Sequence, residues 1–102
     1  MHNLAISVPH ELEQAEAVKR VKELIGLFRD QFAGNISNLK EEWKGNIDTF
    51  NFQADGYPIT GQLTVKASKI EVTGDVPYPA SLFMNVIEAV IIEKAKVLLK
   101  KD

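Results

Sequence analysis

Alternation of hydrophobic and polar residues predicts five β-strands in this chain. The first runs from Leu4 to Val8 and ends at Pro9, since proline cannot donate a ladder hydrogen bond. Four further alternating segments follow one another across short turns, at residues 39–44, 49–54, 59–67 and 70–73. Short turns between alternating strands favour antiparallel hairpins with one buried face. Gly61 lies within the third of these segments and predicts a bulge or the close approach of a helix.

Helical spacing of apolar residues predicts two helices. Residues 10–33 place their apolar side chains on one arc of about 120° and their charged side chains on the rest, which is typical of a helix with one core face and one water face. Residues 80–99 are more apolar, with fourteen apolar residues among twenty and no glycine or proline. At about 100° per residue, the stripe predicted to be buried is Leu82, Phe83, Val86, Ile87, Val90, Ile91, Val97 and Leu98.

A second apolar line runs along the last helix. Ile92 and Leu99 fall opposite the predicted buried stripe, on a side where a helix that lies on a single core should be polar. Together with Met84 they are predicted to form an interaction surface that meets another apolar surface.

The elements follow the order β-α-β-β-β-β-α in a single α+β domain that spans residues 1–102. The first helix carries the chain back, so that the first strand can lie antiparallel beside the last. The predicted fold is therefore a curved, five-stranded antiparallel sheet with both helices packed on one face.

Charge and composition argue against several classes of protein. The net charge of −2 argues against a nucleic-acid binder, because neutralising phosphates requires clustered Lys and Arg. With no cysteine, the chain has no disulfide, thiolate nucleophile or cysteine metal site. Charged residues interrupt the last apolar segment, which argues against a transmembrane segment. Without the features of a secretory signal, the expected location is cytoplasmic.

No pattern of residues is typical of catalysis. His10 beside Glu11 suggests an acid/base pair or half of a metal site, but zinc needs three or four ligands, so we predict an exposed histidine in the first helical turn. Glu41 shares a strand face with Trp43 and either points inward, where it could anchor a ligand, or lies on the wet end of an edge strand. We therefore predict a protein that is not an enzyme and holds no cofactor or metal.

Two interpretations of the aromatic side chains stay open. They either fill the core or line a cavity between the sheet and the last helix. The residues predicted to line such a cavity are Trp43, Phe52, Val65, Phe83 and Ile87.

Landmarks along residues 4–99 resemble those of one protein family. They are the opening strand before Pro9-His10-Glu11-Leu12, the segment Glu16-Ala17-Val18-Lys19-Arg20-Val21, Trp43 before the Gly45-Asn46 turn and Phe50, then Gly56, Gly61, Leu63-Thr64-Val65, Ile70-Glu71-Val72 and Pro77. In this order they are similar to the polyhydroxyalkanoic acid system family, small bacterial proteins described as granule-associated or regulatory. The resemblance implies a link to storage-polyester metabolism and supplies no catalytic residue.

Three functional hypotheses follow. The first is a non-enzymatic accessory protein of polyhydroxyalkanoate or lipid-like metabolism that acts through apolar contacts with a granule or lipid-like surface. The second is a binding module for a small apolar ligand that resembles a reduced helix-grip (START-like) fold. The third is a homodimer with Ile92 and Leu99 in its helix-to-helix seam.

Overall fold

The computed structural model describes residues 2–77 and 81–100 of the 102 residues, and only the backbone of His2 and of residues 81–84. The predicted order of elements is confirmed. The elements are β1 (His2–Pro9), α1 (Gln14–Gln31), β2 (Ile36–Lys44), β3 (Ile47–Ala54), β4 (Tyr57–Val65), β5 (Lys69–Val76) and α2 (Ser81–Leu98).

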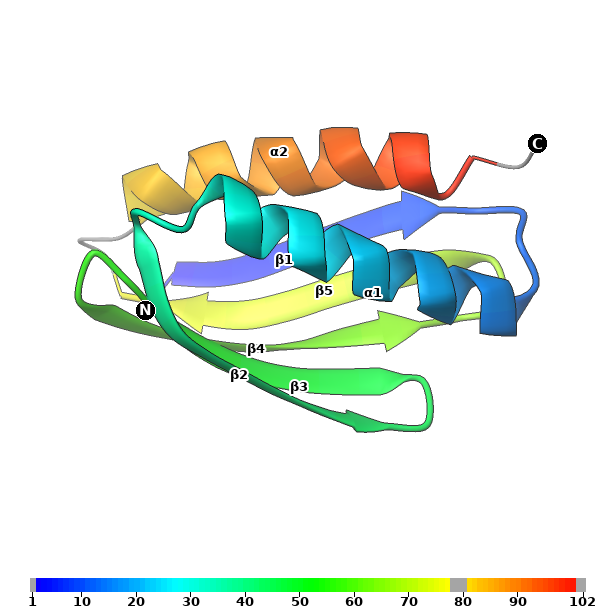
Figure 1. Ribbon diagram of the computed structural model, residues 1–102, viewed down its shortest axis with the longest axis horizontal. Helices are drawn as coiled ribbons and strands as arrows, with labels where there is room; N and C mark the ends of the chain where they lie inside the picture. Colours follow the sequence, from blue (N-terminus) through cyan, green and yellow to red (C-terminus); the bar gives the residue numbers. More distant parts are fainter. Residues whose placement is uncertain (1, 78–80, 101–102) are drawn as a thin grey trace.

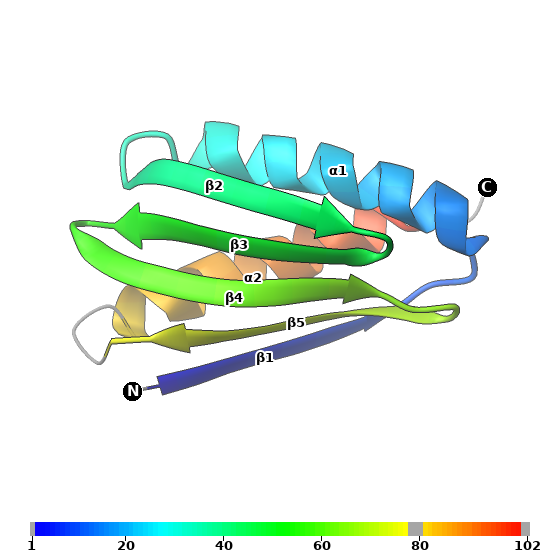
Figure 2. The same cartoon turned by 90° about the horizontal axis from the view of Figure 1, so that it is seen from below.

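One five-stranded sheet has the strand order β1-β5-β4-β3-β2, and every neighbouring pair is antiparallel. The first strand lies beside the last, with Ile6 opposite Val72. Both helices cover the same face of the sheet, here called the inner face, whereas the outer face carries no helix (Figures 1 and 2). The α+β fold predicted from the alternation is therefore confirmed.

Gly61 and Gly74 lie opposite each other in the middle of the sheet, on β4 and β5. The register between β3 and β4 contains no shift, so the bulge predicted at Gly61 is wrong. The ring of Phe50, rather than a helix, covers this position, because an added Cβ would lie 2.7 Å from Phe50 Cζ and 2.5 Å from the backbone oxygen of Thr73. Glycine is required here for the close approach of a neighbouring ring and strand.

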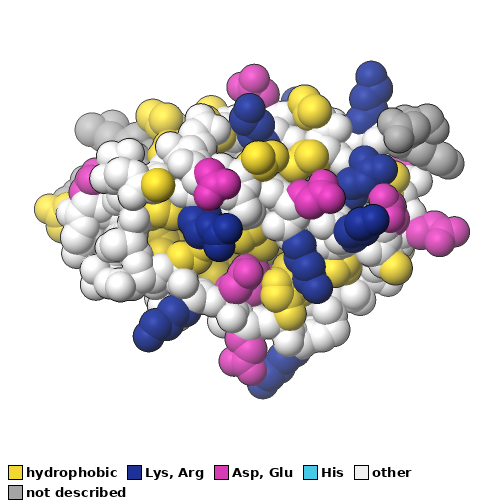
Figure 3. Space-filling view, in the orientation of Figure 1, with side chains coloured by type: hydrophobic (Ala, Val, Ile, Leu, Met, Phe, Trp, Pro, Cys, Tyr) yellow, Lys and Arg dark blue, Asp and Glu magenta, His cyan; other side chains and the backbone are white. Residues whose placement is uncertain are grey.

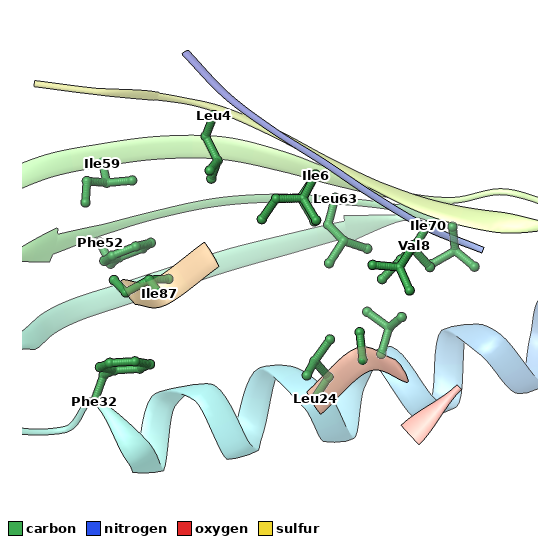
Figure 4. Close-up of a cluster of buried hydrophobic side chains, with 14 of the residues drawn as sticks. Leu4, Ile6, Val8, Leu24, Phe32, Phe52, Ile59, Leu63, Ile70 and Ile87 are labelled. Carbon is green, nitrogen blue, oxygen red and sulfur yellow. The ribbon is translucent and has the colours of Figure 1, made fainter. Parts of the chain in front are cut away.

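The hydrophobic core fills the space between the inner face and the helices. Strand side chains such as Ile6 and Leu63 point toward Leu24 of α1, and Ile87 of α2 closes the same cluster (Figure 4). Alternation places these strand residues on one face, and the 3.6-residue period does the same for α1. The sides of the core that the strands and α1 contribute therefore follow directly from the two periods in the sequence.

The face that α2 turns to the core differs from the predicted stripe. Leu99 is only 3% exposed and Ile92 is half-buried against the core, whereas Val86 is 56% and Val97 69% exposed. The prediction that Leu99 lies away from the core is therefore wrong, as is the predicted burial of Val86 and Val97. The reason is that α2 packs against both α1 and β1, so its buried arc is rotated toward α1.

Arg20 fixes the end of α2 against α1. Its Nη1 donates a 2.8 Å hydrogen bond to the backbone oxygen of Leu98, while its Nε pairs with Glu16 at 2.9 Å. Carbonyl groups in the last turn of a helix have no partner within the helix, so an arginine from a neighbouring helix satisfies one of them. This contact holds the rotation of α2 that buries Leu99.

His10 is buried rather than exposed, because α1 begins only at Gln14 and His10 lies in the connection before it. The backbone N–H of Leu12 donates to His10 Nδ1 at 3.1 Å, so Nε2 carries the proton and donates to the oxygen of Lys66 at 2.9 Å. The prediction that His10 is exposed in the first helical turn is therefore wrong. Both ring nitrogens tie the start of α1 to the β4–β5 turn, which is a structural role.

Candidate ligand-binding cavity

A cavity of about 60 Å³ lies between the inner face of the sheet and both helices. Twelve of its fourteen lining residues are apolar, and the two exceptions are Glu41 and Asp48. Pockets for drug-sized ligands enclose roughly 300–1,000 Å³, and an apolar cavity of about 150 Å³ binds benzene. The space here therefore fits a short alkyl group.

The cavity reaches the surface between α1 and the edge strand β2. Ile25 and Phe28 of α1 and Leu39 of β2 line it and are only half-buried, and Glu41 on β2 is exposed. Figure 1 shows β2 starting near the end of α1 and then diverging from it. On this side of the molecule hydrophobic side chains form a patch between charged ones (Figure 3).

Stacked and tilted aromatic rings form one wall of the cavity. The ring centroid of Phe28 lies 5.9 Å from that of Phe52, and Phe50 stacks on Phe52 at 6.2 Å. Phe28 also contacts Phe32 at 5.2 Å in a tilted arrangement. Such pairs connect α1 to β3 and make this wall stiff.

Lys22 and Trp43 connect α1 to the edge strand β2. The ammonium group of Lys22 on α1 lies 5.3 Å from the ring centroid of Trp43 on β2. A cation–π contact at an exposed site contributes about 0.5–1 kcal/mol. The contact is weak enough to open and close without unfolding either element.

Asp48 is the only fully buried charged side chain among the described residues. It is 0% exposed, and neither carboxyl oxygen has a hydrogen-bond partner. Burial and the neighbouring carboxyl group of Glu41 together raise the pKa of Asp48 to about 7, against the smaller lowering effects of the Glu42 backbone and of Lys22. At neutral pH this carboxyl group can therefore either accept or donate a hydrogen bond to whatever fills the cavity.

The residues predicted to line a cavity are only partly brought together. Phe52 and Ile87 line the cavity, whereas half-buried Trp43 and buried Val65 both lie outside its lining. The side chain of Phe83 lies outside the described residues, as does that of Met84 in the predicted interaction surface. Glu41 is exposed on an edge strand and also lines the cavity, so it combines parts of both alternatives stated for it.

Asp48 is the functional candidate that sequence reasoning missed. The signal that could have found it is the alternation itself, since Asp48, Phe50 and Phe52 occupy successive inward positions of β3.

No three His, Asp or Glu side chains among those described lie close enough together to hold a metal ion.

Comparison with known proteins decides the family. The family model described as "Putative polyhydroxyalkanoic acid system protein" matches residues 4–99. The chain belongs to the polyhydroxyalkanoic acid system family. This membership confirms the resemblance seen in the order of the sequence landmarks.

Among solved structures, the chain is similar to "Crystal structure of Ara h 8.0201". The two share 12% sequence identity with a TM-score of 0.42, and the alignment covers 96% of this chain and 97% of the other. No curated protein matches the chain. Within the described residues, neither helix combines the length and apolarity that crossing a bilayer requires.

Proposed function

We propose that this polyhydroxyalkanoic acid system protein is a non-enzymatic accessory protein that binds a short alkyl group in the cavity between its sheet and helices. The observation that carries the proposal is the apolar cavity itself, which opens at the surface between α1 and β2. The family adds the chemical context, since the side chains of a storage polyester are short alkyl groups. Apolar contact is then made inside the fold rather than through Ile92 and Leu99, which pack on the core.

The size of the cavity sets the expected affinity. Burying one methylene group contributes about 0.8 kcal/mol, so three or four groups contribute about 3 kcal/mol before the costs of association. That value corresponds to a dissociation constant of about 10 mM at best for one alkyl group, and the costs of association weaken it further. A polyester chain would compensate by offering many equivalent groups to many protein molecules.

Filling the opening is expected to abolish binding of a small apolar probe. In an NMR titration with 1-methoxypropane, we expect saturable shifts of the methyl signals of Ile87 and Leu63, both of which line the cavity. Ile25→Trp places an indole in the opening and should reduce these shifts at least tenfold. Leu27→Trp on the same helix is the matched control, because Leu27 is 46% exposed and does not line the cavity. Equal binding by both variants, or no saturable shift in the unmodified protein, would contradict the proposal.

Attachment to the polyester surface through the outer side of α2 is a second candidate. Val86 and Val97 are both exposed, and eleven residues of helix bring them back to the same side after about three turns. We expect a Val86→Lys, Val97→Lys double variant to fold normally, since both positions face water. If this surface docks, the variant should lose most of its co-sedimentation with purified polyester granules. Retained co-sedimentation would remove this candidate and leave the cavity as the site of contact.

A further inference from the structure

The carboxyl group of Asp48 lines the cavity and has no hydrogen-bond partner in it. The side chain is fully buried, lines the cavity and has no hydrogen-bond partner at either Oδ1 or Oδ2. Buried polar side chains in folded proteins nearly always have at least one partner. The remaining side chains around the cavity are apolar except for Glu41, an acidic group that raises the pKa of Asp48. A ligand in the cavity can therefore supply the partner that Asp48 lacks.

The charges that face Asp48 restrict the chemistry of that partner. Glu41 on β2 lies close enough to disfavour a second negative charge, and Lys22 on α1 offsets this only in part. A carboxylate bound beside Asp48 would meet two acidic groups in an apolar setting, where like charges repel strongly. The site therefore disfavours a free carboxylic acid in its ionised form.

We propose that Asp48 selects an uncharged ligand that carries a hydroxyl group on a short alkyl chain, a proposal that rests on the function proposed above. A hydroxyl group can donate a hydrogen bond to the ionised carboxylate and accept one from the protonated carboxyl group. It therefore satisfies Asp48 in either protonation state. An ester or ether oxygen only accepts, so it pairs with the protonated form alone.

Two sources offer this chemistry. One is the hydroxyl end of a polyester chain or a hydroxyacyl ester, and the other is a free aliphatic alcohol. Interior units of a polyester lack the hydroxyl group. Asp48 would thus distinguish chain ends from chain interiors, although both carry the same alkyl side chains.

Isomeric probes test the role of the hydroxyl group. 1-Butanol and 1-methoxypropane have the same atoms, but only the alcohol donates a hydrogen bond. In NMR titrations at pH 7.5 we expect 1-butanol to bind about tenfold tighter than 1-methoxypropane, and butanoate to produce no saturable shift. Methyl 3-hydroxybutyrate should likewise bind more tightly than methyl 3-acetoxybutyrate if a chain end is recognised, and equal binding of these two would leave the free alcohol as the source.

Variants at Asp48 separate this proposal from the function on which it rests. Asp48→Val should bind 1-butanol and 1-methoxypropane within about twofold of each other. Asp48→Asn should also reduce the preference for the alcohol, because its amide always donates a hydrogen bond and therefore pairs with the ether oxygen as well. If the two isomers bind equally to the unmodified protein and Asp48→Val changes neither, the hydroxyl selection is overturned and the apolar cavity stands. Tighter binding of butylammonium than of 1-butanol would also overturn it. If no probe binds at all, the proposed function itself fails.

Discussion

Lowering the pH from 8 to 5 is expected to stabilise the protein by about 2–3 kcal/mol through Asp48 alone. The pKa of this carboxyl group is about 7 in the folded protein, against an ordinary value of 3.8. Between these two values the folded state keeps a proton that the unfolded state releases. The stability contributed by protonated Asp48 is therefore fully present below about pH 4 and is lost as the pH rises through about 7, which is the reverse of the usual behaviour of an aspartate.

Urea denaturation at several pH values measures this effect directly. Asp48→Asn carries no titrating group at position 48, so its stability should change much less between pH 8 and pH 5. Subtracting the two curves removes the titratable groups elsewhere in the protein and leaves the contribution of Asp48 together with its interaction with Glu41. Parallel curves for the two proteins would show that Asp48 titrates normally and is not desolvated.

Glu71 contributes little to the change in stability between pH 5 and pH 8. Lys66 and Lys69 pair with it at 2.7 Å and 3.2 Å, and these contacts lower the pKa of Glu71 below its ordinary 4.5. Its contribution is present above that value and is lost only as the pH falls further. The window from pH 5 to pH 8 therefore reports on Asp48 and excludes Glu71.

Leu99→Ala is expected to cost about 2–4 kcal/mol of unfolding free energy, because it leaves a cavity in a closely packed core. Leu99 is buried, and its backbone N–H continues the helical pattern by donating to Ala95 at 2.8 Å. Val97→Ala is the matched control two residues earlier. Since Val97 is largely exposed, this change should stay within about 0.5 kcal/mol.

Chemical denaturation of both variants gives the measurement, with comparable denaturant dependence as evidence of an intact fold. The decisive result is which of the two variants, Leu99→Ala or Val97→Ala, loses more unfolding free energy. If Val97→Ala were the more costly change, α2 would lie on the core with the face that its apolar stripe alone predicts. Equal small losses would mean that the end of α2 contributes little to the core.

The strands were predictable because their pattern is local. Each hairpin alternates with a period of two, so which side chains share a face follows from residues that are neighbours in the sequence. The same rule fixes α1, whose single water face leaves one rotation on the sheet. Alternation also predicts that Asp48 lies on the inner face of the sheet. The sequence around it does not indicate how deeply its carboxyl group is buried.

The rotation of α2 could not be predicted in the same way. Its apolar residues cover more than one side, so several rotations bury a similar amount of hydrophobic surface. The contacts with α1, including the hydrogen bond from Arg20 to Leu98, select one of them. His10 is a similar case, because its partner Lys66 lies 56 residues away in the chain.

The sequence by itself determined the class and order of the elements, the antiparallel hairpins, the faces of the strands and of α1, and the family. These depend on periodicity and on short-range turn chemistry, which act between residues close in the chain. Only the tertiary structure decided which side of α2 is buried, where the cavity opens and that Asp48 lies in it without a partner. Those features depend on how distant elements pack together, and the free energy of that packing is absent from any local pattern.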